Sequence, residues 1–139
     1  MMKKLVFAVG LPVLLSACGT GESVQIVESC RIEGPLNGAK LAFNEEFKIV
    51  GWAFDKVTGS SPEQINIELF GNEHKSFTAT RFSRPDVVKA LNTPGAEMSG
   101  FVATVPANSL VADQYEIVIV QKTAEHKIEC LPNFMLDVK

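Results

Sequence analysis

The alternation of apolar and polar residues along the chain predicts a series of short β-strands. It is most regular at residues 64–71, QINIELFG, where Ile65, Ile67 and Leu69 share one face. A period of two indicates a strand with one buried face. The other segments that we expect to be strands are VQIVESCRIE (24–33), FKIVGWAF (47–54), HKSFTATRFS (74–83), GFVATVP (100–106), QYEIVIVQK (114–122), HKIECLP (126–132) and NFMLDV (133–138).

The segment at residues 47–54 is apolar on both strand faces, which predicts a central strand covered on both sides. It contains Trp52, the only tryptophan in the chain. We therefore expect Trp52 and Tyr115 to lie in the core, and Trp52→Ala to destabilise the fold by about 3–5 kcal/mol. The alternative is an exposed indole on which a ligand stacks.

One segment, residues 84–92 (RPDVVKALN), has helical character. Pro85 suits a first-turn position, Asp86 lies near the positive N-terminal end, and Lys89 lies toward the other end. The sequence NTPG then ends the pattern, so we expect one or two turns. Seven or eight strands at a spacing of roughly 8–12 residues, with turn signals between them, predict an all-β antiparallel sandwich or barrel.

The start of the chain predicts export. Lys3 and Lys4 precede an apolar run at residues 5–15, which is typical of a signal peptide. A membrane span needs roughly 20 apolar residues, so this run of eleven is too short to cross a bilayer. We expect residues 1–17 to be a cleavable signal peptide.

The segment LSAC (Leu15–Cys18) resembles the lipobox of bacterial lipoproteins. The resemblance implies acylation of the Cys18 thiol, cleavage before Cys18 and acylation of the new amino terminus. Residues 18–23 then form a lipidated tether and residues 24–139 one domain. A glycine after the cysteine, as at Gly19, is similar to the pattern in lipoproteins that are sorted to the outer membrane. We therefore expect a lipid-anchored protein of the outer membrane that faces the periplasm or the cell surface. An ordinary secretory signal followed by an unrelated cysteine is the alternative.

Cys30 and Cys130 remain once Cys18 is assigned to lipid. An even pair of cysteines in an exported protein predicts a disulfide. It joins the two ends of the predicted domain and stabilises it by roughly 4.7 kcal/mol at most. Two buried free thiols are the alternative. A metal site is disfavoured because no histidine neighbours either cysteine, and two ligands cannot complete a tetrahedral site.

The predicted mature chain is mildly acidic. The 13 basic residues of the whole chain fall to 11 when Lys3 and Lys4 leave with the signal, against 16 acidic residues, a formal charge of −5. No basic run of the kind that binds nucleic acid is present. We therefore expect no nucleic-acid partner.

Four short motifs occur in a fixed order: GWAFD (51–55), INIELFG (65–71), RPDV (84–87) and SGF (99–101). This order resembles a bacterial immunoglobulin-like module found beside glycosyltransferase and other envelope-associated domains, over about Pro35–Val120. The resemblance implies an immunoglobulin-like β-sandwich without catalytic residues. Two features depart from the family. Asp113 and Gln114 precede Tyr115, where the family has a glycine before the strand that begins with tyrosine. The cysteine pair is an addition to the family pattern.

The RPDV motif suggests a charged corner. The planar guanidinium of Arg84 matches the geometry of a carboxylate. It is expected to pair with Asp55 or Asp86 and so to tie residues 84–87 to the strand at 47–54. Recognition of a ligand by these three residues is the alternative, and Asp86 is also a candidate cap for the short helix.

The sequence argues against an enzyme. His74 and His126, the only histidines, belong to no metal or catalytic motif, so we expect both on the surface. The chain has no G-x-S-x-G motif, and a disulfide leaves no thiol for a Cys–His pair. We expect no catalytic residues, no cofactor and no metal.

A binding function is therefore expected: a lipid-anchored accessory module that docks on another envelope protein. Binding of a glycan or peptidoglycan is an alternative. Inhibition of a hydrolase by an inserted loop, KVTGSSPE (56–63) or NTPGAEMSG (92–100), is another.

Overall fold

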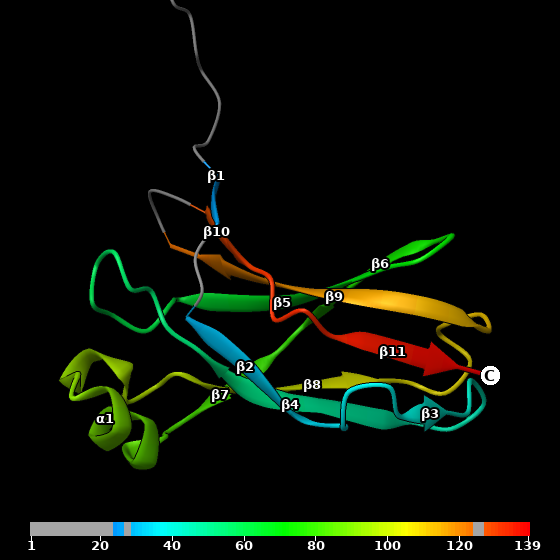
Figure 1. Ribbon diagram of the computed structural model, residues 1–139, viewed down its shortest axis with the longest axis horizontal. Helices are drawn as coiled ribbons and strands as arrows, with labels where there is room; N and C mark the ends of the chain where they lie inside the picture. Colours follow the sequence, from blue (N-terminus) through cyan, green and yellow to red (C-terminus); the bar gives the residue numbers. More distant parts are fainter. Residues whose placement is uncertain (1–23, 27–28, 124–126) are drawn as a thin grey trace, which may run out of the picture.

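Two β-sheets lie face to face and enclose the core of the protein (Figure 1). The computed structural model describes residues 24–26, 29–123 and 127–139, with the backbone alone for 24–26. The predicted signal peptide, the tether with Cys18, and His126 lie outside the described residues. The strands are β1 (Val24–Ile26), β2 (Cys30–Gly34), β3 (Lys40–Leu41), β4 (Phe47–Ala53), β5 (Gln64–Phe70), β6 (His74–Thr78), β7 (Thr80–Phe82), β8 (Gly100–Val105), β9 (Asp113–Lys122), β10 (Lys127–Cys130) and β11 (Met135–Val138).

The larger sheet is built around β9, its longest strand. One edge of β9 pairs with β5, which in turn pairs with β6. The other edge pairs with β11 in its first half and with β10 in its second half. β3 and β1 extend these two branches by parallel pairing with β11 and β10, respectively. The smaller sheet has the order β2-β4-β8-β7 and is antiparallel throughout.

Aliphatic and aromatic side chains from the inner faces of both sheets form the main core. Ile65, Ile67 and Leu69 are fully buried, as the alternation in β5 predicts. They pack with β4, β8 and β9 in one cluster, which also contains Phe101 and Tyr115. The all-β sandwich expected from the sequence is therefore confirmed, and Tyr115 lies in the core as expected.

The Tyr115 hydroxyl has a specific partner. The ring is fully buried, and its hydroxyl donates a hydrogen bond to the carbonyl oxygen of Val111 at 2.8 Å. This bond closes the turn that leads from β8 into β9. Burial raises the pKa of Tyr115, so the hydroxyl remains a donor at neutral pH.

Two predicted strands are each divided between the sheets. The segment 24–33 becomes β1 in the larger sheet and β2 in the smaller one. The segment 74–83 becomes β6 and β7, with the change of sheet at Ala79. Together with the two-residue β3, these divisions raise the described strands to eleven, where the sequence predicted seven or eight. Alternation alone cannot reveal such a crossing, because the period of two continues through it.

The disulfide joins the two sheets. Cys30 in β2 and Cys130 in β10 are bonded, with their Cα atoms 6.2 Å apart and a separation of 100 positions in sequence. Cys130 is almost fully buried within the main core cluster. The prediction of this pair from the cysteine count is confirmed.

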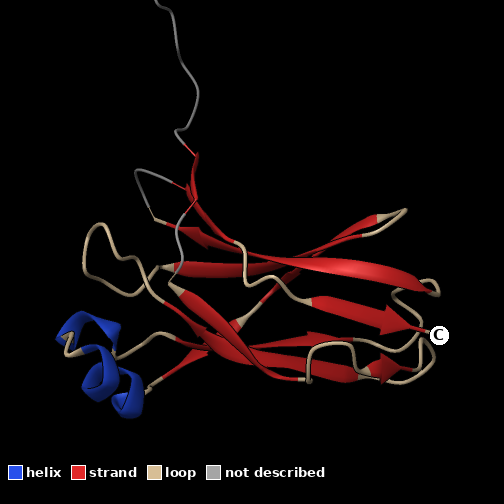
Figure 2. Ribbon diagram, in the orientation of Figure 1, coloured by secondary structure: helices blue, strands red, loops and turns tan. Residues whose placement is uncertain are grey.

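The helical segments gather at one end of the sandwich (Figure 2). α1 (Pro85–Leu91) has Pro85 in its first turn, as predicted, and ends at Asn92, whose φ of 50° is left-handed. The 3₁₀ turn η1 (Pro94–Ala96) follows at once. Among the residues that the structure describes, no helix has the length and hydropathy to cross a membrane.

Candidate functional site

A hollow of about 280 Å³ opens beside α1 at the helical end of the sandwich. We call it the Trp52 hollow. Its apolar lining comes from the end of β4 and from the last residue of α1, and its polar lining from the β4–β5 loop and the segment after α1. The lining residues are Ser29, Trp52, Phe54, Lys56, Gly59, Leu91 and Thr93.

Trp52 does not belong to the main core, so the prediction that it fills that core is wrong. In β4, Ile49, Gly51 and Ala53 point inward and are buried, whereas Trp52 has the opposite parity and is only partly buried. It packs instead on a second cluster of Phe54, Val87 and Ala96, outside the smaller sheet. Both faces of β4 are covered as predicted, but the outer cover is α1 and η1 and leaves part of the indole exposed.

This placement lowers the expected cost of removing the indole. Complete burial of a large aromatic makes its truncation cost about 3–5 kcal/mol, and Trp52 is already partly in water. We expect Trp52→Ala to lower the free energy of unfolding by about 1–2 kcal/mol and to leave the sandwich folded. Urea titration followed by far-ultraviolet circular dichroism measures this. Loss of folding in the variant would mean that the second cluster is essential.

The wall formed by residues 55–61 is held in place by Asp55, which is fully buried. Its carboxylate accepts hydrogen bonds from the amides of Val57 (2.8 Å) and Thr58 (3.1 Å), and from the Thr58 hydroxyl (2.6 Å). These bonds shape the loop that follows β4. Asp55 therefore acts as a structural residue of the hollow's wall.

The β4–β5 loop also packs against η1. A Cβ at Gly95 would overlap the carbonyl oxygen of Gly59, so only glycine allows this approach. The Ser61 hydroxyl donates a hydrogen bond of 2.7 Å to the carbonyl oxygen of Gly95. The two loops that the sequence offered as candidates for inhibiting a hydrolase, residues 56–63 and 92–100, therefore pack on one another.

Arg84 forms a charged corner, but with different partners from those predicted. Its guanidinium donates two hydrogen bonds to Asp86 (2.9 and 2.7 Å) and two to Glu33 (2.6 and 3.0 Å). The expected pairing with Asp86 is present. Asp55 is not among the hydrogen-bond partners of Arg84, and Arg84, which is the N-cap residue of α1, makes no side-chain cap hydrogen bond. Glu33, in β2, is 51 residues from Arg84 in sequence, and no local signal identified it.

This corner predicts a pH dependence of stability. Hydrogen bonding by Arg84 lowers the pKa of Asp86 from 3.8 to about 2. A pKa lowered by folding means that the unfolded chain binds more protons, so stability falls as the pH drops from 3.8 toward about 2. We expect Asp86→Asn to make this fall shallower, in urea titrations across that pH range. Glu45→Gln, at an exposed acid, is the matched control, and an equal change in both variants would contradict the assignment.

The Trp52 hollow is lined by apolar side chains, two hydroxyl groups and one lysine. Across the described ranges, no group of three His, Cys, Asp or Glu side chains is arranged to hold a metal. His74 lies on the surface, as predicted, where its ring stacks on Phe70 and its Nε2 is 2.7 Å from Glu68 Oε2. That pair belongs to β5 and β6 and does not line the hollow.

A larger hollow of about 530 Å³ lies beside the disulfide, between β2 and residues 132–134. Its only aromatic lining residue, Phe134, is buried, and Glu33 at its side is already paired with Arg84. That hollow is also lined by Leu36, which is 78% exposed, and by the exposed Arg31, whereas the Trp52 hollow offers a partly exposed indole and a lysine. The indole makes the Trp52 hollow our candidate for recognition.

Leu91 and Lys56 were not predicted as site residues. Leu91 follows Val87 by four residues, so both lie on the same side of α1, and this spacing is a signal that sequence alone contains. Lys56 follows the GWAFD motif directly and carries no signal of its own. No family of proteins, no curated protein and no solved structure matches this chain.

Proposed function

We propose that this protein is a lipid-anchored, non-catalytic binding module of the bacterial cell envelope, which docks on another envelope protein through its helical end. The anchor in this proposal is Cys18, on the strength of the lipobox resemblance. The binding face consists of the Trp52 hollow and the exposed apolar side chains around it.

The exposure of large apolar side chains at this end carries the proposal. Leu91 lines the hollow with 41% of its surface exposed. Val57 is 61% exposed and lies in the loop between Lys56 and Gly59, which both line the hollow. A contiguous apolar patch on a protein surface marks a site of contact with a partner.

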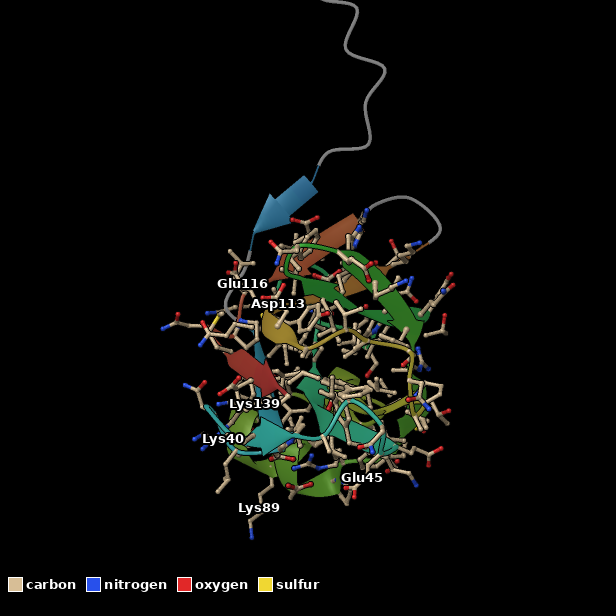
Figure 3. The ribbon with its side chains drawn as sticks, turned by 90° about the vertical axis from the view of Figure 1, so that its right-hand side faces the viewer. Lys40, Glu45, Lys89, Asp113, Glu116 and Lys139 are labelled. Carbon is tan, nitrogen blue, oxygen red and sulfur yellow. A yellow bond between two sulfur atoms is a disulfide. The ribbon has the colours of Figure 1, made fainter. Side chains whose placement is uncertain are left out.

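The opposite end of the sandwich carries both charged and apolar side chains. Charged side chains, among them Lys40, Asp113 and Lys139, gather there (Figure 3). Phe43 also lies there, because its amide donates to the carbonyl oxygen of Lys139. Phe43 and Val111, exposed at 44% and 48%, line a hollow of about 410 Å³, so the helical end is distinguished by the indole of Trp52 and by Lys56, and not by apolar exposure alone.

An immunoglobulin-like topology is part of the proposal. In the immunoglobulin fold, one sheet has the strand order ABED and the other contains strands C, F and G. The order β2-β4-β8-β7 facing β5, β9 and β11 corresponds to it. The hydrogen bond from Tyr115 to Val111 resembles the tyrosine corner of that fold, at the start of the corresponding strand. The disulfide differs, since it joins β2 to β10 and not the strands that correspond to B and F.

Site-specific photo-crosslinking in native membranes tests the docking face. A photoreactive amino acid replaces Leu91 in one full-length chain and Phe43 in another, because these residues are exposed to nearly the same extent, 41% and 44%. We expect a discrete crosslinked product from position 91 and none from position 43, and Trp52→Ala should reduce the former. Equal labelling at both positions, or none at position 91, contradicts the proposal.

Glycan binding is a second candidate, favoured by the partly exposed indole of Trp52. Retention of the purified full-length protein on peptidoglycan, abolished by Trp52→Ala, would support it. Retention that survives this substitution would exclude the Trp52 hollow as the glycan site.

A further inference from the structure

We infer that the Trp52 hollow receives one apolar side chain of the partner protein, next to a carboxylate of the same partner chain that pairs with Lys56. This inference rests on the proposed docking function and names the chemistry of its partner. It predicts that the partner presents an acidic, hydrophobic segment to the helical end.

The size and walls of the hollow fit a single side chain. Its volume of about 280 Å³ lies just below the range of roughly 300–1,000 Å³ that is usual for small-molecule pockets. Trp52, Phe54 and Leu91 all line it, so an inserted aliphatic or aromatic group contacts apolar atoms. Such central apolar anchors supply most of the binding energy of protein interfaces.

The two hydroxyl groups and one backbone amide of the lining already donate hydrogen bonds within the protein. The Ser29 hydroxyl donates to the carbonyl oxygen of Phe54, and the Thr93 hydroxyl donates to that of Leu91 at 3.1 Å. The amide of Gly59 donates to the carbonyl oxygen of Asp55 at 2.8 Å. A neutral sugar presents many hydroxyl groups that need partners, and leaving them unpaired is costly. These bonds therefore favour an apolar group over a sugar ring.

The charge of the lining comes from Lys56. It is exposed, it is the one charged side chain among the described lining residues, and none of the ion pairs between described residues includes it. The nearby Arg84 is already neutralised by Glu33 and Asp86. A carboxylate of the partner thus finds its complement at Lys56, and charge pairs of this kind select among partners.

The fluorescence of Trp52 reports occupation of the hollow directly, since the chain has no other tryptophan. The probes are four capped hexapeptides added to the detergent-solubilised full-length protein. The first is Gly-Ser-Leu-Glu-Ser-Gly, and the others replace Leu by Ser, Glu by Gln, or Glu by Lys. We expect the first peptide to shift the emission of Trp52 to shorter wavelength, the glutamine peptide to bind about fivefold more weakly, and the serine peptide to have no effect.

Lys56 variants test the charge. Lys56→Gln should remove the preference for glutamate over glutamine, and Lys56→Glu should make the lysine peptide the best ligand. Lys48→Glu is the control, an exposed lysine of β4 that does not line the hollow. Circular dichroism confirms that each variant is folded. A preference for glutamate that persists in Lys56→Gln would overturn the role of Lys56.

The outcomes separate this inference from the proposed function. If no peptide changes the emission of Trp52 while position 91 still crosslinks to a protein, the inference is wrong and the docking face stands. If position 91 does not crosslink either, both are wrong. A shift in emission with glucose or glucuronate, but with none of the peptides, would overturn the inference in favour of a glycan ligand.

Discussion

Replacing Cys30 and Cys130 together with alanine is expected to lower the free energy of unfolding by about 2–5 kcal/mol. The bond closes a loop of 100 residues, so its loss frees most of the unfolded chain from a constraint. It also joins β2 of one sheet to β10 of the other, at the point where Cys130 is almost fully buried. Urea titration of the oxidised protein and of the double variant measures the difference.

Reduction supplies the control for this experiment. A thiol reductant should shift the unfolding midpoint of the unmodified protein toward that of the double variant and leave the variant itself unchanged. If the reduced and oxidised proteins unfold at the same urea concentration, the disulfide contributes nothing to stability and the expected loss in the double variant has another cause.

Gly51→Ala is expected to destabilise the protein by about 3 kcal/mol. A Cβ at this position would overlap the carbonyl oxygen of Arg31 in β2 and come within 3.0 Å of the ring of Phe101. Gly51 pairs with Ile32 on one side and with Phe101 on the other, so the methyl group pushes β2 and β8 away from the central strand of the smaller sheet. Thermal unfolding monitored by circular dichroism provides the measurement.

Gly34→Ala is the matched control for Gly51→Ala. Gly34 also lies in the smaller sheet, in β2, but a Cβ there has no heavy atom within 4 Å, and its φ is not in the left-handed region. We expect a change within about 0.5 kcal/mol. If the two variants lose equal stability, the loss in Gly51→Ala comes from a general cost of replacing glycine in this sheet. The close approach at Gly51 would then not be its cause.

Several parts of the fold follow from patterns that act over a few residues. The alternation at 64–71 produces β5 with Ile65 and Leu69 inward, because successive side chains of a strand point to opposite faces. Pro85 begins α1 because the N–H groups of the first turn have no partner within the helix, so proline, which lacks an N–H, loses no hydrogen bond there. The glycine beside Trp52 permits the close approach of the Arg31 backbone and the Phe101 ring.

The candidate site depended on contacts that no local pattern contains. The environment of Trp52 is set by α1 and η1, more than 30 residues later, which cover the outer face of β4 only in part. The second partner of Arg84, Glu33, lies in β2, 51 residues earlier in the chain. Lys56 became a candidate only because the fold places it with Leu91 in the lining of one hollow.

The sequence by itself determined the strand-rich class, the short helix, the cysteine pair and the burial of Tyr115, because each depends on periodicity, on residue chemistry or on an even count of cysteines. The tertiary structure alone decided which strands change sheet, what covers the outer face of β4 and which carboxylates surround Arg84. These features arise from the order in which strands pair, and that order brings together residues whose separation in sequence has no periodic signature. The partly exposed indole beside Lys56 is the main consequence for function.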